Sequence, residues 1–143
     1  MDGHATPADE IRNLLARYAD SVRRKDAEDF SKCFTKDGEW TITGMTMRGR
    51  FAIGDQFCKF LAKSNLVMMF HDIPLITISG ESGTGSTQIT EYIKRNDGSA
   101  IRTLGVYKDK FAHCDGIWLF EKRELFIYYR GSVDFSDQIC DLI

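Results

Sequence analysis

The chain has 143 residues, of which 43% are hydrophobic and 12% aromatic, and its 19 basic and 21 acidic side chains leave a net charge of −2. This composition is typical of one globular domain, expected over residues 1–143, and the near-neutral charge predicts no nucleic-acid partner. No segment approaches the roughly 20 consecutive apolar residues that cross a bilayer, and the first residues have no apolar leader, so we expect a cytoplasmic protein without a membrane partner.

Three helices are predicted in the first half of the chain. Thr6 and Pro7 supply a hydroxyl cap and a proline at the first helical position, and apolar residues then recur at helical spacing as far as Val22. A short helix is predicted over about residues 26–34 and a third over 50–62. Between them, alternating residues predict a strand over 39–43, followed by a hairpin or bulge over 44–49.

Four long β segments are predicted in the second half, at residues 67–79, 85–95, 100–113 and 117–131. Turn-forming residues separate them, including Asn96-Asp97-Gly98 and Asp115-Gly116. Helices followed by antiparallel strands indicate an α+β fold, in which a curled antiparallel sheet packs on three N-terminal helices and leaves a cone-shaped cavity. Both faces of the last segment are partly apolar, which predicts a homo-oligomer, a dimer or trimer, joined through the outer sheet face.

The sequence contains no motif for a cofactor or a metal. There is no glycine-rich phosphate loop, no cluster of histidines and acids, and no nucleophile elbow. The four cysteines, at positions 33, 58, 114 and 140, have spacings that fit neither a zinc site nor a disulfide scaffold, so reduced thiols are expected. We therefore expect chemistry that uses no cofactor.

Several segments, in order, resemble the SnoaL-like branch of the nuclear transport factor 2-like superfamily: "IRNLLARYADSVRRKDAEDFSKCFTKDGEW", "TITG", "RGRFAI", "VYKDKF" and "DGIWLFEKR". The resemblance covers about residues 8–134 and leaves a tail over 135–143. It implies a cone-shaped barrel and cofactor-free proton transfer, because similar proteins include scytalone dehydratase, bile acid dehydratase, dehydrochlorinase, polyketide cyclases and ketosteroid isomerase.

The resemblance also implies a set of catalytic residues. Tyr18, His71 and Arg123 match positions of the family pattern, with His71 as general base or acid and the other two polarising oxygens. Arg23 stands where many of these enzymes have an aspartate that orients the histidine, so Arg23 or Glu91 would replace the missing carboxylate. The alternatives are a structural His71, a core Tyr18, a surface ion pair for Arg23 and a solvent-facing Glu91.

The resemblance, combined with strand alternation and apolar helix positions, implies which side chains bind the substrate, and for the methionines the alternative is that they fill the core. They are Trp40, Met45, Phe57, Met69, Ile89, Thr103, Tyr107, Leu125, Ile127 and Tyr129. Asp109 lies on the same segment as Tyr107 but is expected at the rim, near the turn.

The favoured function is a cofactor-independent lyase or isomerase acting on a hydrophobic, aromatic or polycyclic, hydroxylated substrate. Dehydration, a double-bond shift, cyclisation or loss of a small aldehyde would each begin with removal of a proton beside a stabilised anion. The alternative is a non-catalytic module of the same fold that binds a small molecule or a protein partner. Convergence of His71, Arg123 and one acid on one cavity would favour the enzyme.

Overall fold

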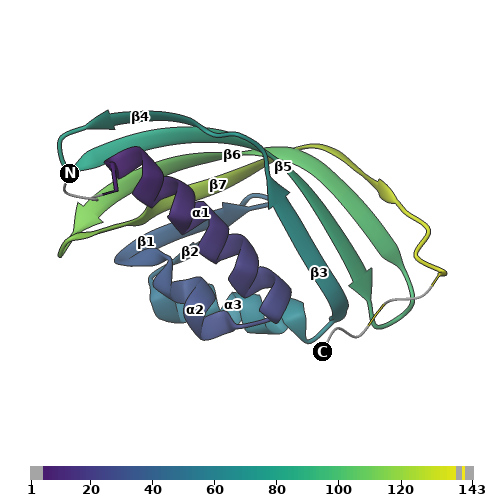
Figure 1. Cartoon of the computed structure of the whole chain (residues 1–143). Helices are drawn as coiled ribbons and strands as arrows, with labels where there is room; N and C mark the ends of the chain where they lie inside the picture. The colour runs from purple at the N-terminus through teal and green to yellow at the C-terminus, as the bar shows by residue number, and fades with distance from the viewer. Residues whose placement is uncertain (1–4, 138–139, 141–143) are drawn as a thin grey trace.

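The computed structural model describes residues 5–137 and residue 140. Figure 1 shows three helices gathered on one side of a strongly curled sheet. The helices are α1 (Pro7–Arg24), α2 (Ala27–Lys32) and α3 (Arg50–Leu61). The strands are β1 (Phe34–Ile42), β2 (Met45–Arg48), β3 (Ser64–His71), β4 (Leu75–Ser79), β5 (Ser82–Arg95), β6 (Ala100–Cys114) and β7 (Ile117–Ser132). The predicted α+β class, with helices covered by a curled sheet, is confirmed.

The seven strands form one unclosed sheet in the order β2-β1-β7-β6-β5-β3, and β4 also pairs with β5. All pairs are antiparallel except β1 with β7, which is parallel. The predicted antiparallel arrangement therefore holds for every pair but this one, whose parallel pairing was not predicted. A tight turn forces its two flanking strands to run antiparallel, but β1 and β7 are joined by the rest of the chain, so no hairpin fixes their relative direction.

Two predicted segments have different boundaries in the structure. The predicted helix over 26–34 ends at Lys32, and β1 begins at Phe34, earlier than the predicted strand over 39–43. The predicted strand over 67–79 is divided into β3 and β4 by an irregular stretch at residues 72–74. Pro74 has no backbone N–H to give to a ladder, which explains the break at this point.

Helix α1 begins as predicted and places its apolar side against the sheet. The Thr6 hydroxyl accepts a hydrogen bond from the Asp9 backbone N–H, and the Asp9 carboxylate accepts one from the Thr6 N–H, which completes a capping box. Tyr18 is buried on this helix and contacts the ring of Phe30 from α2, with centroids 4.8 Å apart. Phe30 in turn stacks on Phe57 of α3 at 3.9 Å. These rings join the three helices into one layer.

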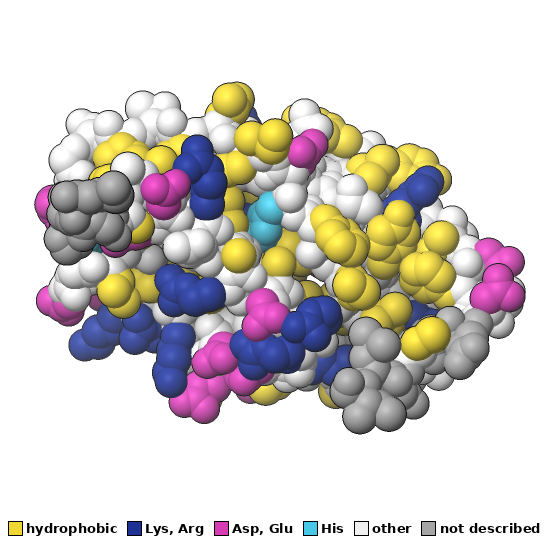
Figure 2. Space-filling view, viewed as in Figure 1, with side chains coloured by type: hydrophobic (Ala, Val, Ile, Leu, Met, Phe, Trp, Pro, Cys, Tyr) yellow, Lys and Arg dark blue, Asp and Glu magenta, His cyan; other side chains and the backbone are white. Residues whose placement is uncertain are grey.

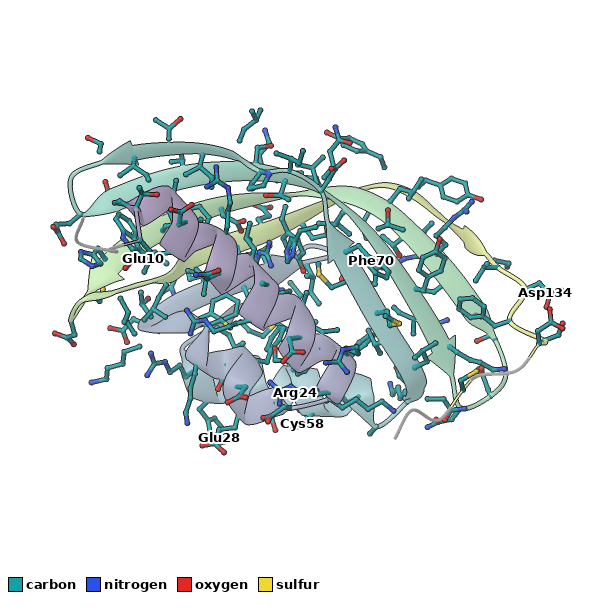
Figure 3. All side chains as sticks on the ribbon, viewed as in Figure 1. Glu10, Arg24, Glu28, Cys58, Phe70 and Asp134 are labelled. Carbon is teal, nitrogen blue, oxygen red and sulfur yellow. The ribbon has the colours of Figure 1, made fainter. Side chains whose placement is uncertain are left out.

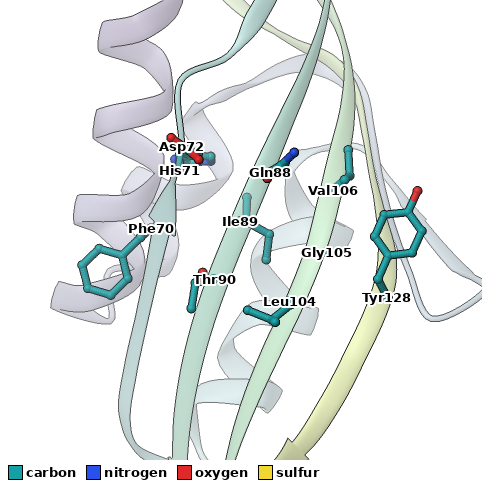
Figure 4. A pocket seen from close by; sticks show the side chains of 10 residues that line it. All are labelled: Phe70, His71, Asp72, Gln88, Ile89, Thr90, Leu104, Gly105, Val106 and Tyr128. Carbon is teal, nitrogen blue, oxygen red and sulfur yellow. The ribbon is translucent and has the colours of Figure 1, made fainter.

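The outer face of the sheet contains a shallow groove, here called the outer groove. It has a volume of about 560 Å³ and is lined by side chains that include Phe70, Thr90, Leu104 and Tyr128 (Figure 4). Phe70 and Tyr128 are 50% and 75% exposed, so this face presents large apolar rings to solvent. Within the described part of the chain, no helix is long and apolar enough to cross a membrane.

Candidate functional site

Arg123 on β7 is a fully buried cation, with 0% of its surface exposed. Its Nε donates to Oδ1 of Asp109 at 2.9 Å and its Nη2 donates to Oδ2 at 3.3 Å. Asp109 is the register partner of Arg123 on β6, and its side chain is also 0% exposed. The expectation that Asp109 lies at the rim is wrong, because β6 continues to Cys114 and Asp109 follows the inward alternation of Tyr107.

Aromatic rings enclose the Arg123 guanidinium. Its central carbon lies 4.2 Å from the ring centroid of Tyr18, 3.8 Å from that of Tyr107 and 4.4 Å from that of Phe120. Each ring presents negative π density to the cation, and a guanidinium is weakly hydrated, so an arginine tolerates this dry position better than a lysine would. The rings and Asp109 together hold a positive charge permanently in the interior.

His71, the last residue of β3, is part of the same cluster. Its Nε2 lies 2.8 Å from Nη2 of Arg123. Because a guanidinium can only donate, Nε2 accepts this hydrogen bond and the ring proton lies on Nδ1. Burial, and then the charge of Arg123, lower the pKa of His71 from 6.5 to about 2. His71 is therefore a neutral imidazole whose basic nitrogen is already occupied.

Two tyrosines connect this cluster to the inner cavity. The Tyr18 and Tyr107 hydroxyls are hydrogen-bonded at 3.0 Å, and Nε1 of Trp40 donates to the Tyr107 hydroxyl at 3.4 Å. Burial raises the pKa of both tyrosines, while the positive charge of Arg123 acts in the opposite direction. Both therefore remain neutral phenols that can donate a hydrogen bond.

The inner cavity lies between the helices and the concave face of the sheet and has a volume of about 210 Å³. Its apolar wall comes from all three helices and from β1, β5, β6 and β7. The lining side chains are Tyr18, Val22, Phe30, Trp40, Ile42, Thr43, Phe57, Phe60, Glu91, Ile93, Arg95, Ile101, Tyr107, Leu125 and Arg130. A small number of polar groups in an apolar wall is typical of a ligand pocket.

Glu91 of β5 is the one acidic side chain among the described residues that line the inner cavity. Its carboxyl has no hydrogen-bond or ion-pair partner in residues 5–137, although the charge of Arg130 acts on it. Burial raises the pKa of Glu91 from 4.5 to about 7, and Arg130 partly opposes this shift. Near neutral pH the carboxyl can therefore both accept and release a proton.

The structure brings together many of the residues predicted from the sequence. Tyr18, Trp40, Phe57, Glu91, Tyr107 and Leu125 all line the inner cavity. His71 and Arg123 lie behind the two tyrosines rather than in the cavity wall. Buried Met69, Ile89 and Thr103 are part of the sheet core and are absent from the wall.

Four other predicted residues lie outside the cavity wall. Arg23 is exposed and forms an ion pair with Asp20, because the inward side of α1 at this level is occupied by Val22. In Figure 2 basic and acidic side chains gather at this end of α1, which Arg24 marks in Figure 3. Met45 is 45% exposed on β2 and Tyr129 is 48% exposed on β7, while Ile127 of β7 is half-buried but is absent from the cavity wall.

A β-bulge explains why Tyr129 does not line the cavity. Gly105 pairs with Ile127 but the preceding residue, Leu104, pairs with Tyr129, so Tyr128 is an extra residue on β7. One extra residue reverses the alternation beyond it. Arg130, the partner of buried Thr103, therefore faces inward in place of Tyr129.

Sequence reasoning did not identify Arg95 and Arg130 as part of the site. Arg95 could have been found, because the inward alternation of Ile89, Glu91 and Ile93 on β5 continues to it. The inward position of Arg130 depends on the bulge at Tyr128, for which the sequence carries no clear signal.

Comparisons with known proteins identify the family. Among solved structures, a variant of Rv3472, a protein of unknown function from Mycobacterium tuberculosis, is 25% identical with a TM-score of 0.75, over 82% of this chain and 74% of that one. LinA type 3, a hexachlorocyclohexane dehydrochlorinase from Novosphingobium barchaimii, is 16% identical with a TM-score of 0.82, over 92% of this chain and 93% of that one. A candidate scytalone dehydratase from Novosphingobium aromaticivorans is 16% identical with a TM-score of 0.80, over 87% of this chain and 86% of that one.

No curated protein sequence matches the chain. The sequence model of the SnoaL-like domain family, in contrast, matches residues 4–124, which is most of the length of this chain. The match includes α1, with Tyr18, and ends one residue after the buried Arg123 of β7. The chain thus belongs to the SnoaL-like domain family.

Proposed function

We propose that the chain is a cofactor-free lyase or isomerase that moves a proton on a hydrophobic, hydroxylated ring compound bound in the inner cavity. The observation that carries this proposal is Glu91, a carboxyl without a partner among residues 5–137 whose pKa is raised to about 7 in an apolar, aromatic cavity. A general base is most effective when its pKa is close to the working pH. A purely structural role would leave such a carboxyl hydrogen-bonded or ion-paired.

Glu91 removes the proton from the substrate carbon and returns it at another position or to the leaving group. The hydroxyls of Tyr18 and Tyr107 lie on another part of the cavity wall. One of them donates to the other, which leaves one hydroxyl proton of the pair to donate to the substrate oxygen on which negative charge develops. Arg123 lies against both tyrosine rings and makes their hydroxyls better donors. The developing anion is thus stabilised by a neutral donor backed by a buried cation.

His71 acts as a positioning residue in this proposal. Its Nε2 is the only ring nitrogen that can accept a proton, and it already accepts a hydrogen bond from Arg123. Asp109 and His71 bind Nη2 of Arg123 and fix its plane against the tyrosine rings. We assign no catalytic role to Arg23, because it is exposed and paired with Asp20.

The comparisons are consistent with a lyase. Proteins of this fold include a hexachlorocyclohexane dehydrochlorinase and a candidate scytalone dehydratase. At 16% identity these matches support the fold, and the reaction is argued from the cavity of this chain.

Hydrogen–deuterium exchange tests the proposal without knowledge of the substrate. The protein is incubated in D2O with cyclic ketones and acyl phenols, and loss of the proton signal beside each carbonyl is followed by NMR. The wild type should accelerate exchange for at least one probe, and Glu91→Gln should lower that rate by about 100-fold or more. Glu124→Gln, which changes an exposed carboxylate on β7, is the matched control and should leave the rate unchanged.

The alternative is a binding module without catalysis. Arg23, in place of an orienting aspartate, and the occupied Nε2 of His71 favour this alternative. If probes bind in the cavity but exchange is never accelerated, or if Glu91→Gln exchanges as fast as the wild type, the binding module is the better description.

We also propose that a second copy of the chain covers the outer groove. Phe70, Leu104, Phe126 and Tyr128 are 38% to 75% exposed on this face, whereas apolar rings of this size are normally buried. A self-complementary contact through one sheet face would give a dimer with two-fold symmetry.

A further inference from the structure

The inner cavity contains two cationic side chains that the proposed proton transfer does not use. Arg95 ends β5 on the same face as Glu91 and Ile93, and Arg130 faces inward from β7 after the bulge at Tyr128. Arg95 is half-buried and Arg130 is exposed, so the two guanidinium groups lie where the cavity opens to solvent. The deep end of the cavity, in contrast, is formed by the buried Tyr18 and Tyr107.

No carboxylate within residues 5–137 forms an ion pair with Arg95 or Arg130, although the charge of Arg95 acts on Asp97 and that of Arg130 acts on Glu91. Most other arginines in this part of the chain have such a partner; Arg24, for example, contacts Asp20, Asp26 and Asp29. Nε of Arg130 donates to the buried Thr103 hydroxyl at 3.4 Å. This contact orients the guanidinium and leaves Nη1 and Nη2 available to a ligand.

The backbone spacing of Glu91 and the two arginines gives the scale of a ligand that could contact both. Glu91 and Arg95 are four residues apart on one strand, which separates their Cα atoms by about 13 Å at roughly 3.3 Å per residue. Glu91, Thr103 and Arg130 are register partners across β5, β6 and β7, so Glu91 and Arg130 are about 10 Å apart. One ring with a short side chain fits between the carboxyl of Glu91 and the two cations.

The cavity volume limits the number of rings. At about 210 Å³ it is somewhat larger than the roughly 150 Å³ cavity that holds benzene, and smaller than the roughly 300 Å³ at which drug-sized pockets begin. A single substituted ring fits this space, whereas the polycyclic substrate expected as one possibility from the sequence does not.

We propose that the substrate is a monocyclic carboxylic acid whose carboxylate binds Arg95 and Arg130 at the cavity mouth. The ring lies among Phe30, Trp40 and Phe57, and the carbon that loses its proton faces Glu91. The position of the reacting carbon rests on the proposed function, but recognition of the carboxylate does not. An arginine matches a carboxylate with two parallel N–H donors, so this contact selects acids over neutral analogues.

Paired probes of equal shape test the inference. Calorimetry measures the binding of 3-phenylpropanoate and of its uncharged amide, 3-phenylpropanamide, to the wild type and variants. The wild type should bind the acid about 10- to 100-fold more tightly than the amide. In Arg95→Gln/Arg130→Gln the two affinities should become nearly equal, and in Arg95→Lys/Arg130→Lys part of the preference should remain.

Arg102→Gln is the matched control, because this exposed arginine neighbours Thr103 on β6 and so points to the opposite face of the sheet. It should keep the full preference for the acid, and melting curves of each variant establish that it is folded. Equal binding of acid and amide by the wild type, an unchanged preference in the folded double glutamine variant, or no binding of the acid at all would each overturn the inference.

Glu91→Gln separates this inference from the proposed function. Its preference for the acid should be at least that of the wild type, while its exchange rate falls. If exchange survives in Glu91→Gln, the proposed proton transfer fails although carboxylate recognition stands. If the preference for the acid is absent but exchange depends on Glu91, the proton transfer stands and the substrate class is wrong.

Discussion

Replacing Asp109 by leucine should destabilise the protein by about 3 kcal/mol. Both side chains of the Asp109–Arg123 pair are 0% exposed, and the substitution removes the carboxylate that accepts hydrogen bonds at 2.9 and 3.3 Å. A buried charge that loses its partner costs about 3–5 kcal/mol. In the variant the rings of Tyr18, Tyr107 and Phe120 still face the Arg123 cation, and each cation–π contact contributes about 1 kcal/mol. The expected loss of stability therefore lies at the low end of this range.

Urea unfolding, followed by the fluorescence of the buried Trp40 and Trp118, measures this loss. The double variant Asp109→Leu/Arg123→Met removes both charges and should be more stable than Asp109→Leu alone, because no unpaired ion remains. As the control, Asp55→Asn breaks an exposed pair with Lys59 and should cost about 0.5 kcal/mol or less. A loss below about 1 kcal/mol in Asp109→Leu, or a double variant less stable than that single one, would refute the reasoning.

Because burial raises the pKa of Glu91 from 4.5 to about 7, the folded chain keeps a proton that the unfolded chain has released, so stability should fall as pH rises between these values. Urea titrations across this range should show this slope in the wild type and a reduced one in Glu91→Gln; equal slopes would contradict the raised pKa. His71→Ala should slow hydrogen–deuterium exchange of the substrate probe by less than about 10-fold, and the pH at which the exchange rate is half-maximal should not change. A decrease of the exchange rate by about 100-fold would instead make His71 the base. Leu104→Glu and Tyr128→Glu should each convert a dimer to a monomer in light-scattering measurements. Ile117→Glu, which changes another exposed apolar residue, is the control and should leave the dimer intact. A monomeric wild type would contradict the proposal that a second copy covers the outer groove.

Much of the fold could be predicted from local patterns. The capped start of α1 and the helical spacing of Ile11, Leu14 and Tyr18 place three buried residues on one face. The tight turns before β6 and before β7 were visible as Asn96-Asp97-Gly98 and Asp115-Gly116, which bend the chain at the expected points. The parallel pairing of β1 with β7 was not visible, because register between strands distant in sequence is set by the whole sheet.

Which side chains line the cavity could be predicted where strand alternation is unbroken, but not beyond a bulge. Tyr107 and Glu91 follow regular two-residue alternation and line the cavity as expected. Tyr129 was expected there as well, but the bulge at Tyr128 gives its place to Arg130. The interaction between His71 and Arg123 joins residues 52 positions apart, and no local pattern predicts that the arginine would occupy the basic nitrogen.

The parallel pairing of β1 with β7 has a consequence for synthesis on the ribosome. Trp40 of β1 pairs with Arg123 of β7, so their contact spans 83 positions, and the strand that completes it is the last of the sheet to be translated. Until residues 117–132 emerge, the β1–β2 hairpin has no central strand to pair with. The cavity also lacks Arg123, the cation that lies against its tyrosine rings. Contacts of such long range slow folding. The nascent chain therefore exposes its aromatic interior until β7 has been translated, and this stage is the one at which its apolar surface is most open to aggregation.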